Sequence, residues 1–265
     1  MLGAATKVPI LRKLIYSKIR KALMDFFGGE LRCITLGGAP LSYEVEVFLR
    51  RINFPYAMGY GLTEAAPLVS GSLPSETKLG ASGKVVPEME VKIVNPNPET
   101  GAGEIWLRGP NIMKGYYKNE SLTKEVLTED GWLITGDLGY LDSDSYIYIR
   151  GRSKNMILTA AGENIYPENI EEKLNMHPWV QESVVYEKEG KIVAKVYLNY
   201  DVLKEELEGH SEREREQIVS GILNKIRDDV NHQLPHYSRL YGLFEYPQPF
   251  EKTPTNKIKR FLYVD

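Results

Sequence analysis

The feature that most constrains the fold is a strand, turn, helix and strand in the first quarter of the chain. The apolar run LRCITL, residues 31–36, is followed by the turn GGAP, a helical pattern over residues 42–52 and a second apolar run, FPYAMGY. Two strands joined through a helix lie parallel. Both strands then end at one edge of the sheet, outside which ligands bind. The turns GGAP and GYGLTE, one after each strand, are therefore predicted to converge on one crevice.

Apolar periodicity predicts which helix faces are buried. In the first helix, an apolar residue recurs at every fourth position, and Gly28-Gly29 ends the pattern: Leu11, Ile15, Ile19, Leu23 and Phe27. We expect this face to pack on the core, with a solvated basic side opposite. In the helix at 42–52, the same periodicity predicts that four residues face the core: Val45, Phe48, Leu49 and Ile52.

The pattern changes twice further along the chain. From about Glu76 to Gly151, short alternating runs such as MEVKIV and EIWLR are separated by turn sequences, which indicates antiparallel strands in a small barrel or sandwich. Beyond this point, Pro167 marks a helix start, and a hairpin, a charged helix at 202–230 and a final strand, YGLFEY, follow. This last part is predicted to be a compact α+β unit.

Composition excludes several classes of protein. The chain has 265 residues and a formal net charge of −3, which gives no reason to expect nucleic acid as a partner. A single cysteine, Cys33, excludes an internal disulfide and favours a reducing compartment. No run reaches the roughly 18 apolar residues of a membrane helix, and neither Cys33 nor the four histidines show zinc-ligand spacing. We expect a soluble, cytoplasmic protein without a transmembrane segment.

The stretch GYGLTE is the first candidate site. Gly59 and Gly61 allow the backbone to come close to a ligand, and Tyr60 offers a flat face for an aromatic base. Thr63 offers a hydroxyl and an amide to a phosphate, and Glu64 is a hard oxygen ligand of the kind that Mg²⁺ prefers. The alternative is an ordinary glycine-rich turn with a capping threonine. GASGKVV, at 80–86, lacks phosphate-loop spacing and is interpreted as a β turn.

Two more residues are candidates with simple alternatives. Asp137, in WLITGDLG, follows a strand, and its carboxylate could accept both hydroxyls of a ribose. Aspartate beside glycine is also a common turn former. Lys257, in KTPTNKIKR, is a mobile point charge suited to phosphate, or it is one more surface lysine.

Taken in order, the motifs resemble those of the adenylate-forming superfamily, which includes acyl-CoA synthetases, luciferases and peptide-synthetase adenylation domains. The matching stretches are GGAPL, GYGLTEAAP, GEIWLRGPNIMKGYY, GWLITGDLG, YIRGRSKNMI, GENIYPENIE and PTNKIKR. GGAPLSYEV and GENIYPENIEE are most similar to long-chain fatty acyl-CoA ligases. The resemblance implies an α/β remnant of a larger sheet domain at 1–75, a β-barrel-like subdomain at 76–151 and an α+β C-terminal lid domain at 152–265.

The resemblance also implies a role for each matching residue. The GGAP turn (Gly38, Ala39, Pro40) would lie on one side of adenine and Tyr60 on the other. Thr63 would contact the α-phosphate and Glu64 would hold Mg²⁺. Asp137 and Arg152 would bind the ribose. Lys154 would be the hinge of the lid, and Lys257 would meet the substrate carboxylate and the phosphate, so Lys257, Thr63 and Glu64 are the expected catalytic residues.

The implied reaction has two halves and uses a fatty acid, ATP, Mg²⁺ and CoA. A carboxylate attacks the α-phosphate of ATP to give acyl-AMP and release pyrophosphate, and the CoA thiol then displaces AMP to give the acyl-CoA thioester. Family members carry a phosphate loop upstream of GGAP that this chain lacks, so we expect the C-terminal portion of a longer enzyme, inactive alone but able to bind AMP weakly. Where the family has glycine before the catalytic lysine, this chain has Asn256, which tolerates left-handed backbone.

Two alternatives stay open at this point. One is a non-catalytic nucleotide-binding or interaction module that keeps the fold without the missing loop. The other is an enzyme of the same superfamily that activates an amino acid or an aryl acid. The sequence also leaves open a homo-oligomer and a peripheral contact with a membrane.

Overall fold

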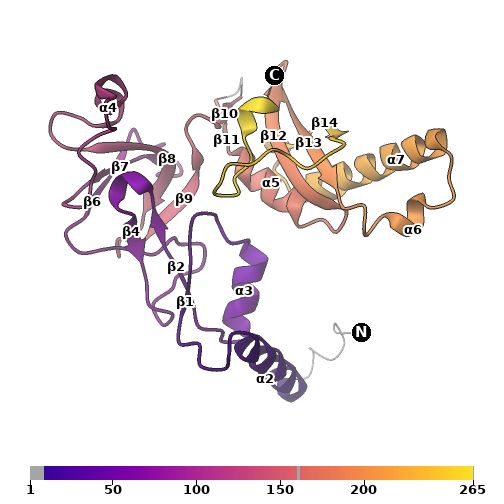
Figure 1. The fold of residues 1–265 in the computed structure, drawn as a ribbon, viewed down its shortest axis with the longest axis horizontal. Coiled ribbons are helices and arrows are strands. Elements are labelled where there is room, and N and C mark those ends of the chain that lie inside the picture. The colour runs from indigo at the N-terminus through magenta and orange to yellow at the C-terminus, as the bar shows by residue number, and fades with distance from the viewer. Residues whose placement is uncertain (1–8, 160–161, 265) are drawn as a thin grey trace. The chain divides into compact units, whose positions relative to one another are not determined.

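The computed structural model describes residues 9–159 and 162–264. The chain divides into two compact units, Met1–Ile149 and Arg150–Asp265 (Figure 1). The sequence places a break at Arg152, and the further boundary that it places at residue 75 stays a prediction. Each unit is described on its own.

The first unit begins with the predicted βαβ pattern. Helix α2 (Pro9–Phe26) leads to β1 (Ile34–Leu36), helix α3 (Tyr43–Arg51) and β2 (Tyr56–Met58). The two strands pair in parallel, with Leu36 opposite Met58, which confirms the predicted orientation. Both strands therefore run toward the turns that follow them.

The buried face of α3 differs from the predicted one. Ile52, at its C-terminal cap, is 3% exposed, but Val45 and Phe48 are 44% and 37% exposed. The face of α3 that turns inward carries Glu46, which accepts hydrogen bonds from the Tyr56 hydroxyl at 3.0 Å and from the amide of residue 80 at 2.8 Å. A satisfied carboxylate thus takes the place that apolar periodicity assigns to Val45 and Phe48.

Helix α2 partly buries the middle of the predicted stripe, at Ile15, Ile19 and Leu23. Ile19 and Leu23 pack, together with Tyr16, against a small core that includes Ile52 and Tyr56. Phe27 lies beyond the helix end and is 44% exposed, so its predicted burial is wrong. Gly28 and Gly29, which both have positive φ, end the helix as predicted. The predicted burial of Leu11 concerns a side chain outside those that the structure describes.

The rest of the first unit is antiparallel β structure. One sheet has the order β3-β4-β5 and another the order β6-β7-β8-β9. Among the described residues no pairing joins β6 to β9, so the predicted barrel-like closure is not observed. The elements are β3 (Tyr60–Gly61), η1 (Thr63–Ala65), β4 (Leu68–Gly71), β5 (Lys84–Val85), β6 (Glu90–Val94), β7 (Gly103–Arg108), α4 (Glu120–Val126), β8 (Leu133–Leu141) and β9 (Ile147–Arg152).

The second unit is an α+β fold built on the predicted hairpin. Strands β12 and β13 are antiparallel, and β14 joins β13 in parallel. Helices α5 and α7 share one core with the sheet, whereas Val184, Phe250 and Tyr263 form another cluster. The elements are β10 (Ile157–Leu158), β11 (Asn164–Ile165), α5 (Pro167–Asn175), β12 (Val180–Lys188), β13 (Lys191–Leu198), α6 (Lys204–Leu207), α7 (Glu212–Asn231), η2 (His236–Ser238), β14 (Gly242–Glu245) and η3 (Arg260–Leu262).

Local sequence signals explain the helix starts in this unit. Pro167 is the first residue of α5, as predicted. The single charged helix predicted at 202–230 is wrong, because α6 ends at Leu207 and α7 starts after Ser211. Ser211 and Glu214 form a capping box, which satisfies the first amides of α7 and fixes the new start. No helix that the structure describes is long and apolar enough to cross a membrane.

Candidate functional site

The two glycine-bearing turns meet at the ends of β1 and β2. The amide of Gly59 donates a hydrogen bond to the carbonyl of Leu36 at 2.9 Å. A Cβ placed on Gly37 would lie 3.1 Å from the Gly59 carbonyl oxygen, so the two backbones approach as closely as glycine allows. Gly38 has a φ of 83°, which favours glycine, and the GGAP turn is exposed. The two turns thus come together at the carboxyl ends of β1 and β2, with glycine at the points of closest backbone approach.

Tyr60 and Asp137 lie side by side in this unit. The Tyr60 hydroxyl donates to Asp137 Oδ2 at 2.6 Å, although 77 residues separate them. The Asp137 amide donates to Thr135 Oγ1 at 3.0 Å, and the Thr135 hydroxyl donates to the Ile105 carbonyl at 2.6 Å. Strand β8 therefore holds the carboxylate, which is 6% exposed, in a fixed place next to the tyrosine.

The Thr63-Glu64 pair sits in the short helix η1, directly after β3. Glu64 is half-buried, and its Oε1 accepts a hydrogen bond from the Tyr116 hydroxyl at 2.9 Å. Burial, together with this hydrogen bond to Glu64, raises the pKa of Tyr116 above its ordinary value. Thr63 is exposed. The Glu64 carboxylate and the Thr63 hydroxyl thus lie directly after the second glycine-bearing turn.

Asn111 braces this loop, and the sequence analysis assigned it no role. Its side-chain amide donates to the carbonyls of Ala65 at 2.7 Å and Leu68 at 3.0 Å. Asn111 and Tyr116 both lie in GPNIMKGYY, a stretch that the analysis matched as a motif without naming a functional residue in it. Their place in a matched motif directly after a strand is the one signal that the sequence offers for them, and it does not say what they contact. Thr135 carried no comparable signal.

Three further predicted residues lie in the second unit. Arg152 ends β9, and its carbonyl accepts from the amides of Asn155 and Met156 at 3.1 Å, which closes a turn around the exposed Lys154. Lys257 is exposed in a hairpin, where its carbonyl accepts from the Thr253 amide at 2.8 Å. Asn256 has a φ of 62°, in the left-handed region, at the position where the resemblance described above implies glycine.

The donor set limits which metal the site could hold. Within residues 9–159 and 162–264, no three or more His, Cys, Asp or Glu side chains gather so that they could hold a metal ion. Mg²⁺ bound with a nucleotide needs only one or two carboxylates, because phosphates and water supply its other ligands. Glu64, a single half-buried carboxylate, fits that arrangement and does not fit a metal cage made only of protein ligands.

Known proteins with similar sequences include several CoA ligases. Residues 8–117 match the model of the AMP-binding enzyme family. The chain is 34% identical to 4-coumarate–CoA ligase 1 of Glycine max over 243 residues, which covers 87% of this chain and 78% of that one. It is 38% identical to the long-chain-fatty-acid–CoA ligase FadD15 of Mycobacterium bovis over 179 residues, 68% of this chain and 28% of the relative.

A solved structure shares the fold. The O-succinylbenzoate coenzyme A synthetase MenE from Bacillus subtilis, in complex with AMP, matches with a TM-score of 0.73 and 29% identity over 94% of this chain. The same synthetase, solved with ATP and a magnesium ion, matches with a TM-score of 0.69 and 29% identity over 91%. The match covers 50% and 49% of the two synthetase chains, so this chain spans about half of their length.

Proposed function

Because the chain belongs to the adenylate-forming family of AMP-binding CoA ligases, we propose that its first unit binds adenylate. The single observation that carries this proposal is the 2.6 Å hydrogen bond between Tyr60 and Asp137, next to the meeting point of the two glycine-bearing turns. Adenine would lie between the GGAP turn (Gly38, Ala39, Pro40) and the ring of Tyr60, and the Asp137 carboxylate would accept the ribose hydroxyls.

The phosphate end of the nucleotide would face η1. Thr63, which is exposed, would donate to the α-phosphate, and the carboxylate of Glu64 would hold Mg²⁺ against the phosphate oxygens. Bound there, Mg²⁺ would neutralise the charge that gathers on the phosphates. Tyr116, whose hydroxyl donates to Glu64, would fix the carboxylate in one orientation.

The second unit would supply the remaining groups. Arg152 would reach the ribose, Lys154 would lie at the hinge, and Lys257 would pair with the attacking carboxylate and the α-phosphate in the adenylation step. The left-handed backbone of Asn256 keeps the tight turn before Lys257 where glycine is expected. A swing of this unit between the two half-reactions is the kind of hinge motion that would exchange one set of groups for another.

We propose that the complete reaction activates a carboxylic acid with ATP and transfers the acyl group to CoA. A long-chain fatty acid is the acid that we favour, because GGAPLSYEV and GENIYPENIEE resemble fatty acyl-CoA ligases and FadD15 is 38% identical. Relatives whose names give coumarate or succinylbenzoate as the acid make an aryl acid the second candidate. An ATP–pyrophosphate exchange assay with palmitate, 4-coumarate and 2-succinylbenzoate separates the two.

Calorimetry with AMP tests the nucleotide site directly. We expect AMP to bind the chain, and the Asp137→Ala variant to bind it at least about tenfold more weakly, because two charge-assisted hydrogen bonds to the ribose are lost. Asp201→Ala, which removes an exposed carboxylate in the second unit, is the matched control and should leave the affinity unchanged. Absence of AMP binding by the wild type would favour a scaffold or interaction module instead.

A further inference from the structure

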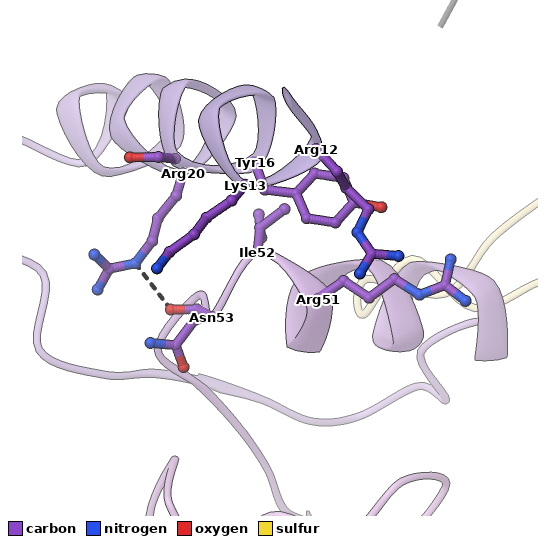
Figure 2. A pocket seen from close by; sticks show the side chains of 8 residues that line it. Arg12, Lys13, Tyr16, Arg20, Arg51, Ile52 and Asn53 are labelled. Atoms are coloured by element: carbon purple, nitrogen blue, oxygen red, sulfur yellow. Dashed lines mark hydrogen bonds between the residues drawn. The ribbon is translucent and has the colours of Figure 1, made fainter. Parts of the chain in front are cut away.

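A basic groove lies between α2 and the end of α3, within the first unit. It has a volume of about 830 Å³, and four cationic side chains line it: Arg12, Lys13, Arg20 and Arg51. Figure 2 shows the guanidinium groups of Arg12 and Arg51 directed into the same space from the two helices. None of the described residues that line the groove is acidic.

No described residue neutralises the charges of Arg12, Lys13 and Arg51. Other cations of the first unit do have partners: Lys21 pairs with Asp25 at 2.7 Å, and Lys78 pairs with Asp142 at 2.7 Å. No ion pair or hydrogen bond engages the side chains of Arg12, Lys13 or Arg51 in the part of the chain that the structure describes. Like charges that share a groove repel one another, and an anion between them would relieve this repulsion.

The cations form two groups with an apolar middle. Arg12 and Arg51 lie at one end, and Lys13 and Arg20 lie toward the other, where Arg20 Nε donates to the Asn53 carbonyl at 2.9 Å (Figure 2). Tyr16 and Ile52 lie between the groups. Guanidinium pairs favour the bidentate recognition of phosphate, and a volume in this range suits a small organic molecule.

The groove is separate from the proposed nucleotide site. Ile52 and Asn53 precede β2, whereas the GYG turn follows it, and GGAP likewise follows β1. Because β1 and β2 are parallel, the groove lies toward the starting ends of the strands and the glycine-bearing turns lie at their far ends. A ligand in the groove would therefore not compete with AMP.

We propose that this groove is an anion-binding site for a small molecule that carries two or more phosphate groups on one ring, with the ring against Tyr16 and Ile52. Arg12 and Arg51 clamp one phosphate, and Lys13 and Arg20 receive another. The same chemistry is presented by a free sugar phosphate and by a phosphoinositide headgroup. Insertion of α2 into a lipid layer is a different mode, and we do not favour it, because Ile19 and Leu23 on its apolar face already pack against the core.

Calorimetry with inositol trisphosphate tests the site. We expect wild type to bind this probe, with an affinity that falls as salt is added, and Arg12→Gln/Arg51→Gln to bind it at least about tenfold more weakly. Lys18→Gln/Lys21→Gln is the matched control, because it removes the same charge from exposed positions of α2 outside the groove. Excess AMP should leave the wild-type affinity unchanged.

A vesicle measurement distinguishes a lipid headgroup from a free phosphate ester, and a melting measurement checks that the double variant folds. Flotation with phosphatidylcholine vesicles, with and without phosphatidylinositol bisphosphate, assigns the headgroup as ligand if binding needs both the lipid and the two arginines. Binding of the soluble probe without vesicle binding assigns a free phosphate ester. Since no described residue forms an ion pair or hydrogen bond with the side chains of Arg12 and Arg51, the double variant should melt no lower than wild type. The proposal is overturned if neither probe binds, if AMP displaces the probe, or if both double variants weaken binding equally.

Discussion

At the scale of single residues, Gly61 shows how tightly the turn around Thr63 and Glu64 is closed. A Cβ on Gly61 would lie 1.9 Å from the carbonyl oxygen of Pro67, which also accepts a hydrogen bond from the Leu62 amide at 2.9 Å. A side chain cannot be accommodated there unless the loop that carries η1 opens. The position of Thr63 and Glu64 thus depends on residue 61 having no side chain.

Gly61→Ala is therefore expected to destabilise the protein by about 1–3 kcal/mol, as overpacking does. Gly221→Ala is the matched control, since a Cβ at this position in the middle of α7 would meet nothing within 4 Å. Alanine there should stabilise the protein by up to about 1 kcal/mol, because it favours the helix. Urea unfolding followed by circular dichroism measures both. Equal effects of the two substitutions would contradict the close approach at Gly61.

Residue types and spacing in the sequence predicted a part of the candidate site. Tyr60, Thr63, Glu64 and Asp137 stand out because aromatic, hydroxyl and carboxylate groups interrupt glycine-bearing turns. Their roles toward a nucleotide stay predictions. Tyr116 and Asn111 could not be assigned in this way, because each acts through a contact with a segment more than forty residues away. Tyr116 donates a hydrogen bond to Glu64, and Asn111 donates to the carbonyls of Ala65 and Leu68.

At the scale of the elements, the anchoring of α3 depends on a buried polar contact that periodicity does not predict. Glu46 is 2% exposed and accepts from the Tyr56 hydroxyl of β2 and from the amide of residue 80. Burial, and secondly the hydrogen bond to Glu46, raises the pKa of Tyr56 to about 12. The helix, the strand and a loop are thus joined at one carboxylate.

This contact gives the stability of the first unit a dependence on alkaline pH. The pKa of Tyr56 is higher in the folded protein than in the unfolded chain, so its contribution is fully present below pH 10 and is lost as the pH rises toward about 12. At neutral pH, Tyr56→Phe should lower the free energy of unfolding by about 1–2 kcal/mol. The difference from wild type should shrink between pH 10 and pH 12.

Denaturant unfolding at a series of pH values checks this expectation. Tyr117→Phe is the control, because Tyr117 is 89% exposed and its removal should not change the pH profile. A difference between wild type and Tyr56→Phe that stays constant up to the alkaline end would show that the hydroxyl keeps no raised pKa in the folded protein.

The order of elements was more predictable than their boundaries and buried faces. The parallel pair β1 and β2, the hairpin of β12 and β13 and the start of α5 at Pro167 follow from local pattern and turn chemistry. The break between α6 and α7 was missed, because the charged composition continues through it while the capping box at Ser211 decides the start. Closure of a sheet into a barrel depends on pairings between distant strands, which composition does not specify.

At the scale of the whole molecule, the proposed chemistry needs both units. Lys257 lies in the second unit, and its proposed partner is the nucleotide held by the first. A lysine that stabilises the charge of the first half-reaction has no comparable task in the second, where a thiol displaces AMP. The two half-reactions therefore separate its role from a general effect on folding.

In a protein that performs both half-reactions, Lys257→Ala is expected to slow acyl-AMP formation by about a hundredfold or more. Thioester formation from preformed acyl-AMP should fall by less than about tenfold. Lys188→Ala, at the exposed end of β12, is the control. Quenched-flow measurement of each half-reaction makes the comparison, and an equal loss in both would contradict the assigned role.

The central claim is that the two glycine-bearing turns and Asp137 surround one adenylate, and hydrogen exchange with and without AMP tests it most directly. The account predicts that AMP slows amide exchange together in three segments: the GGAP turn at 37–40, the GYGLTE turn at 59–64 and the β8 segment around Asp137. The Asp137→Ala variant should show no such protection at the same AMP concentration. Protection elsewhere in the chain without change in these three segments would contradict the account.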